Sequence, residues 1–334
     1  MKFKHLLVAA AFAVGSVASS AGAETTLLNA SFDVARETFA EVNPKFVDYW
    51  KEKTGDTVRI DQSFAGTSRQ AQDILRGKKV DTVTFNQVTD IEVLADKGFV
   101  AKDWAERLPN NSSPYYSTIA FLVRKDNPKN IKNWDDLVRE DVSLVFPNPK
   151  TSGNARYTYL AAWLYANEKF DGDQDKIQEF VGQVLGNVAS FPTGGRGATV
   201  AFAQNGQGDA LLTFESEVIN IANGEEFKAE GFEVIVPPVS VLAEFPVAVV
   251  DKVADEKGTT DLATEYLKFQ YTPDIQALLA SFNYRVIDED VVKANADKFA
   301  EVRLINPTEV LGSWTEIQDK HFATDGLLDQ IQAR

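Results

Sequence analysis

Apolar and polar residues follow two different periods along this chain, and the two alternate from the N-terminal to the C-terminal end. Short apolar runs, such as Ile119–Val123, are typical of buried strands, and residues 34–51 place apolar side chains at helical spacing. This alternation predicts an α/β chain with mainly parallel sheets. The predicted strands are 25–30, 57–62, 80–85, 119–123, 143–146, 210–214, 232–236 and 244–250, and the predicted helices are 34–51, 68–76, 90–97, 154–167, 177–185, 198–205, 261–270 and 273–282.

Two extended apolar runs divide the chain into three parts. The run at 119–123 follows a polar, proline-bounded segment, and the run at 244–250 comes much later. We interpret these runs as crossings between two lobes. Lobe 1 then contains residues 24–115 and about 245–334, and lobe 2 contains residues 116–244. A length of 334 residues also favours two domains over one, so the pattern predicts a hinged clamshell.

The N-terminal segment has the organisation of a secretory signal peptide. Lys2 and Lys4 precede a short apolar run at residues 6–17, and small residues follow up to Ala23. We therefore expect residues 1–23 to be removed before Glu24. The apolar run is too short to span a bilayer as a helix.

Composition excludes several classes of function. The chain has no cysteine and two histidines, of which only His321 lies beyond the signal segment. The chain therefore lacks the side chains that a His/Cys metal site or a Ser-His-Asp or Cys-His catalytic system requires. We predict no metal, no catalytic residue and no cofactor. We assign His321 a packing or surface role. A net charge of −15 disfavours nucleic acid as a partner, and no phosphate-loop or dinucleotide motif occurs.

Four segments share one design, in which a strand end is followed by Gly, Ser, Thr or Asp and then by a helix. A helix N-terminus carries unpaired backbone N–H groups and a partial positive charge, and an anion satisfies both. Each segment alone is also explained as an ordinary N-cap. Two of them fall in each predicted lobe, at the strand ends where open α/β sheets bind ligands, and together they favour an anion site. The segments are residues 31–33, 65–68, 151–154 and 194–197.

Arg156 and Arg196 each lie just after one of these segments. Either residue could contact an anion directly or could brace its loop against a carboxylate. A direct ionic contact would accept any anion of the right charge, whereas neutral donors each point at one lone pair. We therefore favour bracing for both arginines.

Seven stretches are long or distinctive enough to compare with known families: residues 29–33, 61–63, 83–90, 108–114, 144–163 (LVFPNPKTSGNARYTYLAAW), 193–199 and 214–218. They resemble the family of periplasmic sulfate- and thiosulfate-binding proteins, and look closest to its thiosulfate-binding branch. The resemblance implies a two-lobed type II periplasmic binding fold, a monomer in the periplasm, and delivery of thiosulfate or sulfate to the membrane permease of an ABC importer. It also implies that the protein is not an enzyme.

The resemblance also implies which groups hold the ligand. They are the backbone amides of Asp33, Thr67, Gly153, Asn154 and Gly195, the Ser152 hydroxyl, and Ser68 in the same turn as Thr67.

Phe214 is also predicted to bind the ligand, and it stands where the sulfate-binding branch has a tryptophan that donates to the anion. A phenylalanine ring cannot donate a hydrogen bond, so the ranking of thiosulfate and sulfate stays open. With neutral donors alone, we expect affinity to change little between about pH 5 and 8. The alternatives are a phosphate- or molybdate-binding protein, in which Asp33 or Glu215 could accept a hydrogen bond from protonated phosphate, and an anion-using hydrolase.

Overall fold

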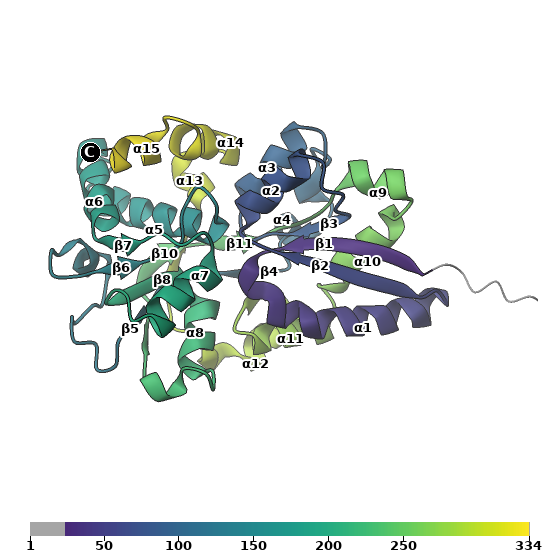
Figure 1. Cartoon of the computed structure of the whole chain (residues 1–334), viewed down its shortest axis with the longest axis horizontal. Coiled ribbons are helices and arrows are strands. Elements are labelled where there is room, and N and C mark those ends of the chain that lie inside the picture. The colour runs from purple at the N-terminus through teal and green to yellow at the C-terminus, as the bar shows by residue number, and fades with distance from the viewer. Residues whose placement is uncertain (1–23, 334) are drawn as a thin grey trace, which may run out of the picture.

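The computed structural model describes residues 24–333, so the predicted signal peptide at 1–23 lies outside the described residues. The chain forms two lobes that lie side by side (Figure 1). The sheet of lobe 1 has the strand order β12-β3-β1-β2. In it β1 runs parallel to β2 and β3, and β12 runs antiparallel to β3. These strands are β1 (Thr25–Ser31), β2 (Val58–Phe64), β3 (Thr82–Thr84) and β12 (Val247–Val249).

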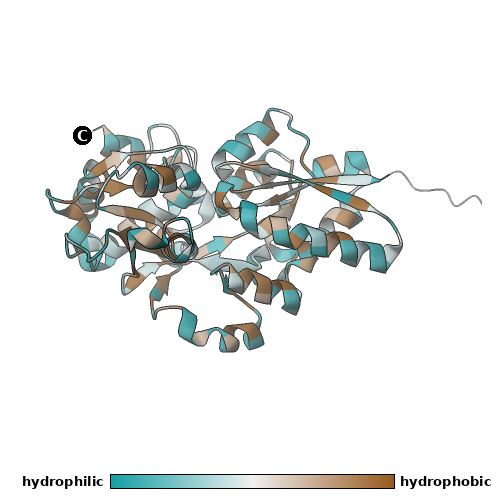
Figure 2. Cartoon of the chain, turned by 60° about the horizontal axis from the view of Figure 1, so that its bottom comes forward, coloured by the Kyte–Doolittle hydropathy of each residue, from teal (hydrophilic) through white to brown (hydrophobic). Residues whose placement is uncertain are grey.

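Helices cover this sheet with their apolar faces turned inward. The helix predicted at residues 34–51 is confirmed as α1. Its regularly spaced apolar residues Phe39, Val42 and Phe46 are buried. Hydrophobic segments concentrate in the interior of each lobe, and polar segments on the outer helices (Figure 2). The helices of lobe 1 are α1 (Arg36–Thr54), α2 (Thr67–Leu75), α3 (Val88–Asp96), α4 (Pro109–Ser112), α9 (Asp251–Lys257), α10 (Thr260–Phe269), α11 (Pro273–Ser281) and α12 (Glu289–Ala294).

Lobe 2 is built around a five-stranded sheet of order β7-β6-β8-β5-β9. Its central helix, α5, is buried along most of its length. The strands are β5 (Ile119–Val123), β6 (Leu144–Val145), β7 (Val188–Ser190), β8 (Ala210–Phe214) and β9 (Glu233–Ile235). The helices are α5 (Gly153–Lys169), α6 (Gln174–Gly186), α7 (Gly195–Thr199), which a π-helical turn continues to Gln204, and α8 (Glu215–Asn223).

Both sheets are mixed: two of the three strand pairings in the lobe 1 sheet and two of the four in the lobe 2 sheet are parallel. β5 is antiparallel to both of its neighbours, and β12 is antiparallel to β3. Each of these two strands enters its sheet directly from the hinge. A strand that arrives without a helical crossover is free to pair antiparallel, whereas the remaining neighbours are joined through helices.

The hinge is a three-stranded antiparallel sheet of order β11-β4-β13. The predicted crossing at 244–250 is broken at Pro246 into β11, which lies in the hinge, and β12, which lies in lobe 1. A further pair, β10 with β14, is parallel. These strands are β4 (Tyr115–Ser117), β10 (Val239–Val241), β11 (Ala243–Phe245), β13 (Arg285–Val286) and β14 (Arg303–Ile305).

The C-terminal tail packs on lobe 2, although the sequence grouped it with lobe 1. Its helices α13 and α15 contact α5 and α6, and α14 reaches α3 of lobe 1 (Figure 1). His321 is fully buried beside Trp163, with its Nδ1 atom 3.0 Å from the Tyr159 hydroxyl. This histidine therefore fastens the tail to α5, a packing role. The tail helices are α13 (Pro307–Leu311), α14 (Trp314–Ile317) and α15 (Leu327–Gln332).

Candidate functional site

The four turns singled out in the sequence all follow carboxyl ends of parallel strands: β1, β2, β6 and β7. The two lobes touch at these turns. A Cβ atom on Gly66 would lie 2.3 Å from the backbone oxygen of Thr151 in the opposite lobe. Only glycine permits so close an approach, so the turns of lobe 1 and lobe 2 face each other across a closed cleft.

At the start of α2, the side chains of Thr67 and Ser68 are already engaged. Both hydroxyls donate to Asp90 Oδ2, at 2.6 Å and 3.1 Å. The N-cap residue Gly66 has no side chain with which to cap the helix. What this turn offers to an anion is therefore its backbone N–H groups rather than its hydroxyls.

The start of α5 lies directly opposite. A Cβ atom on Gly153 would be 2.6 Å from Thr67 Oγ1. The N-cap residue Ser152 is 2 % exposed, and its hydroxyl makes no capping hydrogen bond. Asn154 donates from its side chain to Thr213 Oγ1 at 2.6 Å, which leaves its backbone N–H in the first turn of the helix. The α2 and α5 N-termini therefore present donors to one small region.

The start of α7 is capped from the other lobe. The backbone N–H of Arg196 donates to Asp33 Oδ2 at 3.2 Å, and the backbone N–H of Val34 donates to Asp33 Oδ1 at 3.1 Å. Burial raises the pKa of the Asp33 carboxyl, although these two N–H groups act in the opposite direction. Gly195 is the first residue of α7, so its backbone N–H is one of the N-terminal groups that the helix itself cannot pair.

A second buried carboxyl, that of Glu217, lies beside the same N-terminus. A Cβ atom on Gly195 would be 3.3 Å from Glu217 Oε2. Glu217 accepts hydrogen bonds from Thr213 and, at 2.8 Å, from Thr199 Oγ1. Burial raises its pKa to about 7, and the charge of Asp33 acts in the same direction. This region therefore contains a group that titrates near neutral pH.

Arg156 crosses the cleft. Its Nη1 atom donates to Asp90 Oδ1 at 3.2 Å, to Thr89 Oγ1 at 2.9 Å and to Gln318 Oε1 at 3.1 Å. The side chains of Arg156 and Asp90 are 9 % and 3 % exposed, so this is a buried ion pair between α5 and α3. Its geometry is that of a brace between the lobes.

Arg196 also contacts lobe 1. Its guanidinium pairs with Glu37 on α1, and the side chains are 51 % and 56 % exposed. An exposed pair of this kind contributes little to stability. Both arginines next to the predicted turns therefore have carboxylate partners in the opposite lobe.

Phe214 is the last residue of β8 and is 1 % exposed. Its ring centroid lies 4.7 Å from that of Phe245 in the hinge and 6.2 Å from that of Tyr157. The next residue, Glu215, is fully buried and bound to Arg285 at 2.6 Å and 2.9 Å. Both oxygens of Glu215 are thus held by a hinge arginine, whereas the carboxyls of Asp33 and Glu217 lie at the N-terminus of α7.

Comparison with known proteins identifies the family. The model of the bacterial extracellular solute-binding protein family matches residues 34–285. The thiosulfate-binding protein of Escherichia coli (strain K12) is 52% identical over 311 residues, which cover 92% of this chain and 91% of that protein. The thiosulfate-binding protein of Pseudomonas aeruginosa is 46% identical over 330 residues, covering 98% of both chains. The chain belongs to the sulfate- and thiosulfate-binding protein family.

Solved structures agree with this assignment. The sulfate-binding protein SubI from Mycobacterium tuberculosis H37Rv superimposes with a TM-score of 0.79 at 29% sequence identity, over 90% of this chain and 100% of that one. The ferric binding protein from Campylobacter jejuni shares the fold with a TM-score of 0.64 and 18% identity, over 91% of this chain. As a member of a solute-binding family, the protein is a binding protein and not an enzyme.

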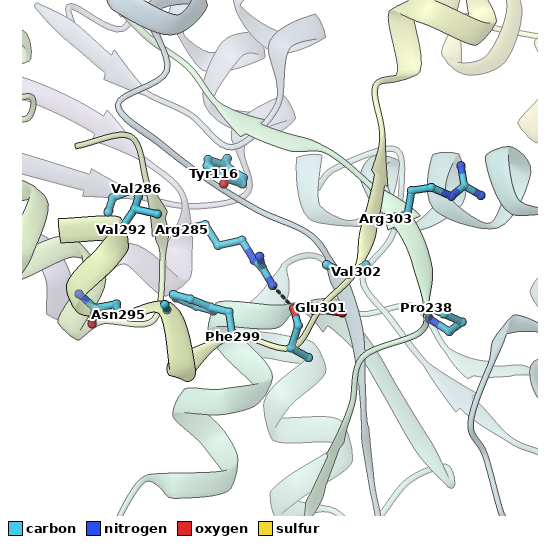
Figure 3. A pocket seen from close by; sticks show the side chains of 12 residues that line it. Tyr116, Pro238, Arg285, Val286, Val292, Asn295, Phe299, Glu301, Val302 and Arg303 are labelled. Carbon is cyan, nitrogen blue, oxygen red and sulfur yellow. Dashed lines mark hydrogen bonds between the residues drawn. The ribbon is translucent and has the colours of Figure 1, made fainter. Parts of the chain in front are cut away.

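A separate cavity of about 680 Å³ lies at the hinge, beside Tyr116, Phe299 and the two arginines 285 and 303 (Figure 3). Both arginines have carboxylate partners. Arg285 is bound to Glu215, and Arg303 donates to Glu168 Oε1 at 2.7 Å. This cavity therefore offers no free cation to an anion, and it contains none of the residues predicted for the binding protein's site.

Asp90 is the clearest residue that sequence reasoning overlooked. It lies in the first turn of α3, where an acidic residue is ordinary because it favours the helix dipole. Its role depends on Arg156, which is 66 positions away in the chain. Within residues 24–333 no cluster of three or more metal-ligating side chains occurs, and no helix combines the length and apolar character needed to cross a membrane.

Proposed function

We propose that this protein captures thiosulfate or sulfate in the cleft between its lobes, with the N-termini of α2, α5 and α7 as the main donors. The observation that supports this most is the meeting of these N-termini from opposite lobes, while the neighbouring arginines are held by carboxylates. Backbone N–H groups carry a partial positive charge and suit an oxyanion that has no proton to give. The names of the relatives, thiosulfate-binding and sulfate-binding proteins, point to the same ligands.

The ligand-binding groups in this proposal are those predicted from the sequence. They are the backbone N–H groups of Asp33, Thr67, Gly153, Asn154 and Gly195, the hydroxyl of Ser152 and the ring of Phe214, with Arg156 and Arg196 as braces. Ser68 contributes through its place in the first turn of α2, since its hydroxyl is bound to Asp90.

Calorimetric titration with thiosulfate, sulfate, phosphate and molybdate tests the proposal. We expect binding of the two sulfur oxyanions and no comparable binding of the other two. A response to phosphate or molybdate without a response to either sulfur oxyanion would contradict it.

A pair of glycine variants tests whether the ligand is held by closure of this cleft. In Gly153→Ala the new Cβ atom would lie 2.5 Å from Asn86 Oδ1 and Gln87 Cβ, so the lobes cannot close as they do here. We expect weaker binding with the fold retained. The matched control is Gly186→Ala, because a Cβ atom there meets nothing within 4 Å. Equal affinity of the two variants would argue against a ligand site between the lobes.

We further propose that the mature protein acts as a monomer in the periplasm, begins at Glu24, and delivers its ligand to the membrane permease of an ABC importer. Membership of an extracellular solute-binding family supports export. The intact mass of protein isolated from the periplasm should correspond to a chain that starts at Glu24, and a mass that includes Met1–Ala23 would contradict the cleavage.

A further inference from the structure

One donor at the cleft has no hydrogen-bond partner among residues 24–333. Gln87 is fully buried, and its Nε2 atom makes no hydrogen bond within the described residues. Its other amide atom, Oε1, accepts from the backbone N–H of Thr89 at 3.2 Å and caps α3. That bond fixes which end of the amide is oxygen. Buried polar groups in native proteins are nearly always paired, so this N–H₂ group requires an explanation.

Gln87 lies where the donors of the two lobes meet. It follows β3, whose carboxyl end lies beside those of β1 and β2 at one edge of the sheet. A Cβ atom on Gly153 would be 2.5 Å from Gln87 Cβ and 2.6 Å from Thr67 Oγ1. The unpaired amide therefore belongs to a residue wedged between the N-termini of α2 and α5.

We propose that Gln87 Nε2 donates a hydrogen bond to the bound oxyanion and is a ligand-binding residue of this protein. The inference rests on the proposed function, and it adds a side-chain donor from a turn that was not among the four predicted ones. In this proposal Oε1 caps α3 and Nε2 binds the ligand. The bond from Thr89 holds Oε1 in place and polarises the amide, which strengthens Nε2 as a donor.

Two variants of Gln87 and one control test this. Gln87→Met removes both the donor and the acceptor of the side-chain amide at nearly constant volume. Gln87→Glu keeps an acceptor for Thr89 but replaces the donor with an oxygen. The control is Gln270→Met, because Gln270 is also fully buried with an unpartnered amide and lies at the end of α10, away from the cleft. Each variant is titrated with thiosulfate and with sulfate at pH 8, and its unfolding by urea is measured without ligand.

We expect Gln270→Met to bind like the wild type. Gln87→Met should bind roughly tenfold to over a hundredfold more weakly, the usual effect of losing a hydrogen bond to a charged group. Gln87→Glu should bind more weakly still, because an ionised carboxylate would face a dianion. Since Gln87→Glu retains the cap of α3, it remains decisive if Gln87→Met fails to fold.

Affinities of the Gln87 variants within twofold of the Gln270→Met control would overturn the inference, and would mean that Gln87 caps α3 and at most binds a water molecule. Failure of the proposed function is distinguishable from this result. In that case the wild type and the control would themselves bind neither sulfur oxyanion.

Discussion

The titration of Glu217 gives the most quantitative prediction. Its carboxyl is buried beside the N-terminus of α7, where Asp33 and Arg196 are the neighbouring charged groups and Thr213 and Thr199 donate hydrogen bonds. Burial raises the pKa of Glu217 from 4.5 to about 7. The folded protein thus holds this proton more tightly than the unfolded chain does.

The free energy of unfolding follows from this difference. Each tenfold change in proton affinity is worth about 1.4 kcal/mol, so the change from 4.5 to about 7 corresponds to roughly 3 kcal/mol. Because the folded state binds more protons than the unfolded state within this window, stability falls as pH rises from about 4.5 to 7 and levels off above it. In Glu217→Gln the side chain is always neutral, and we expect this part of the pH dependence to disappear.

Urea unfolding of the wild type and Glu217→Gln at pH 5 and pH 8 measures the effect. Most of this change falls between the two values, so the wild type should lose about 2.5 kcal/mol more than the variant. Asp33, whose pKa is also raised by burial, remains in the variant, so the comparison removes the Glu217 titration together with its interaction with the Asp33 charge. Equal losses in the wild type and the variant would refute the reasoning.

The same group changes our expectation for ligand binding. Neutral donors alone predicted an affinity that is nearly constant from about pH 5 to 8, but an ionised Glu217 beside the α7 N-terminus repels an anion. We now expect thiosulfate to bind more weakly at pH 8 than at pH 6, and binding near pH 7.5 to take up protons. Calorimetry in two buffers of different ionisation enthalpy detects that uptake. If the affinity of the wild type does not change with pH, the charge of Glu217 does not interact with the bound anion.

Three further substitutions test other parts of the site. Ser152→Ala should weaken thiosulfate binding roughly tenfold to over a hundredfold. Its stability to urea should change little, because the hydroxyl makes no capping bond; a loss of stability at constant affinity would mark Ser152 as a cap only. Phe214→Trp should shift the affinity ratio of the two anions toward sulfate by about tenfold, because it adds an N–H donor, and equal weakening of both would indicate a packing role alone. Arg156→Met should lower the free energy of unfolding by about 3–5 kcal/mol, since it leaves the buried charge of Asp90 without its cationic partner, and an unchanged urea midpoint would contradict this.

Local elements were predictable because their causes are local. β8 was predicted at residues 210–214 and occupies Ala210–Phe214, since a short apolar run between polar turns has few other structures open to it. The helix predicted at 154–167 is α5, Gly153–Lys169. The four turns that we propose to bind the anion were also visible, because a Gly- or Ser-rich turn between a strand and a helix determines its own backbone N–H directions.

Partners distant in the chain were not predictable from the pattern. Asp90 looked like an ordinary acidic residue in the first turn of a helix, and Gln87 like an ordinary polar residue after a strand. Their surroundings come from α2 and α5, which the chain forms separately and the fold brings together. The directions of β5 and β12 were also not predictable, because they too depend on partners distant in the chain. The same holds for the packing of the C-terminal tail on lobe 2. A hydrophobic pattern encodes which face of an element is buried, but the element that covers that face is selected by packing and charge pairing across the whole molecule.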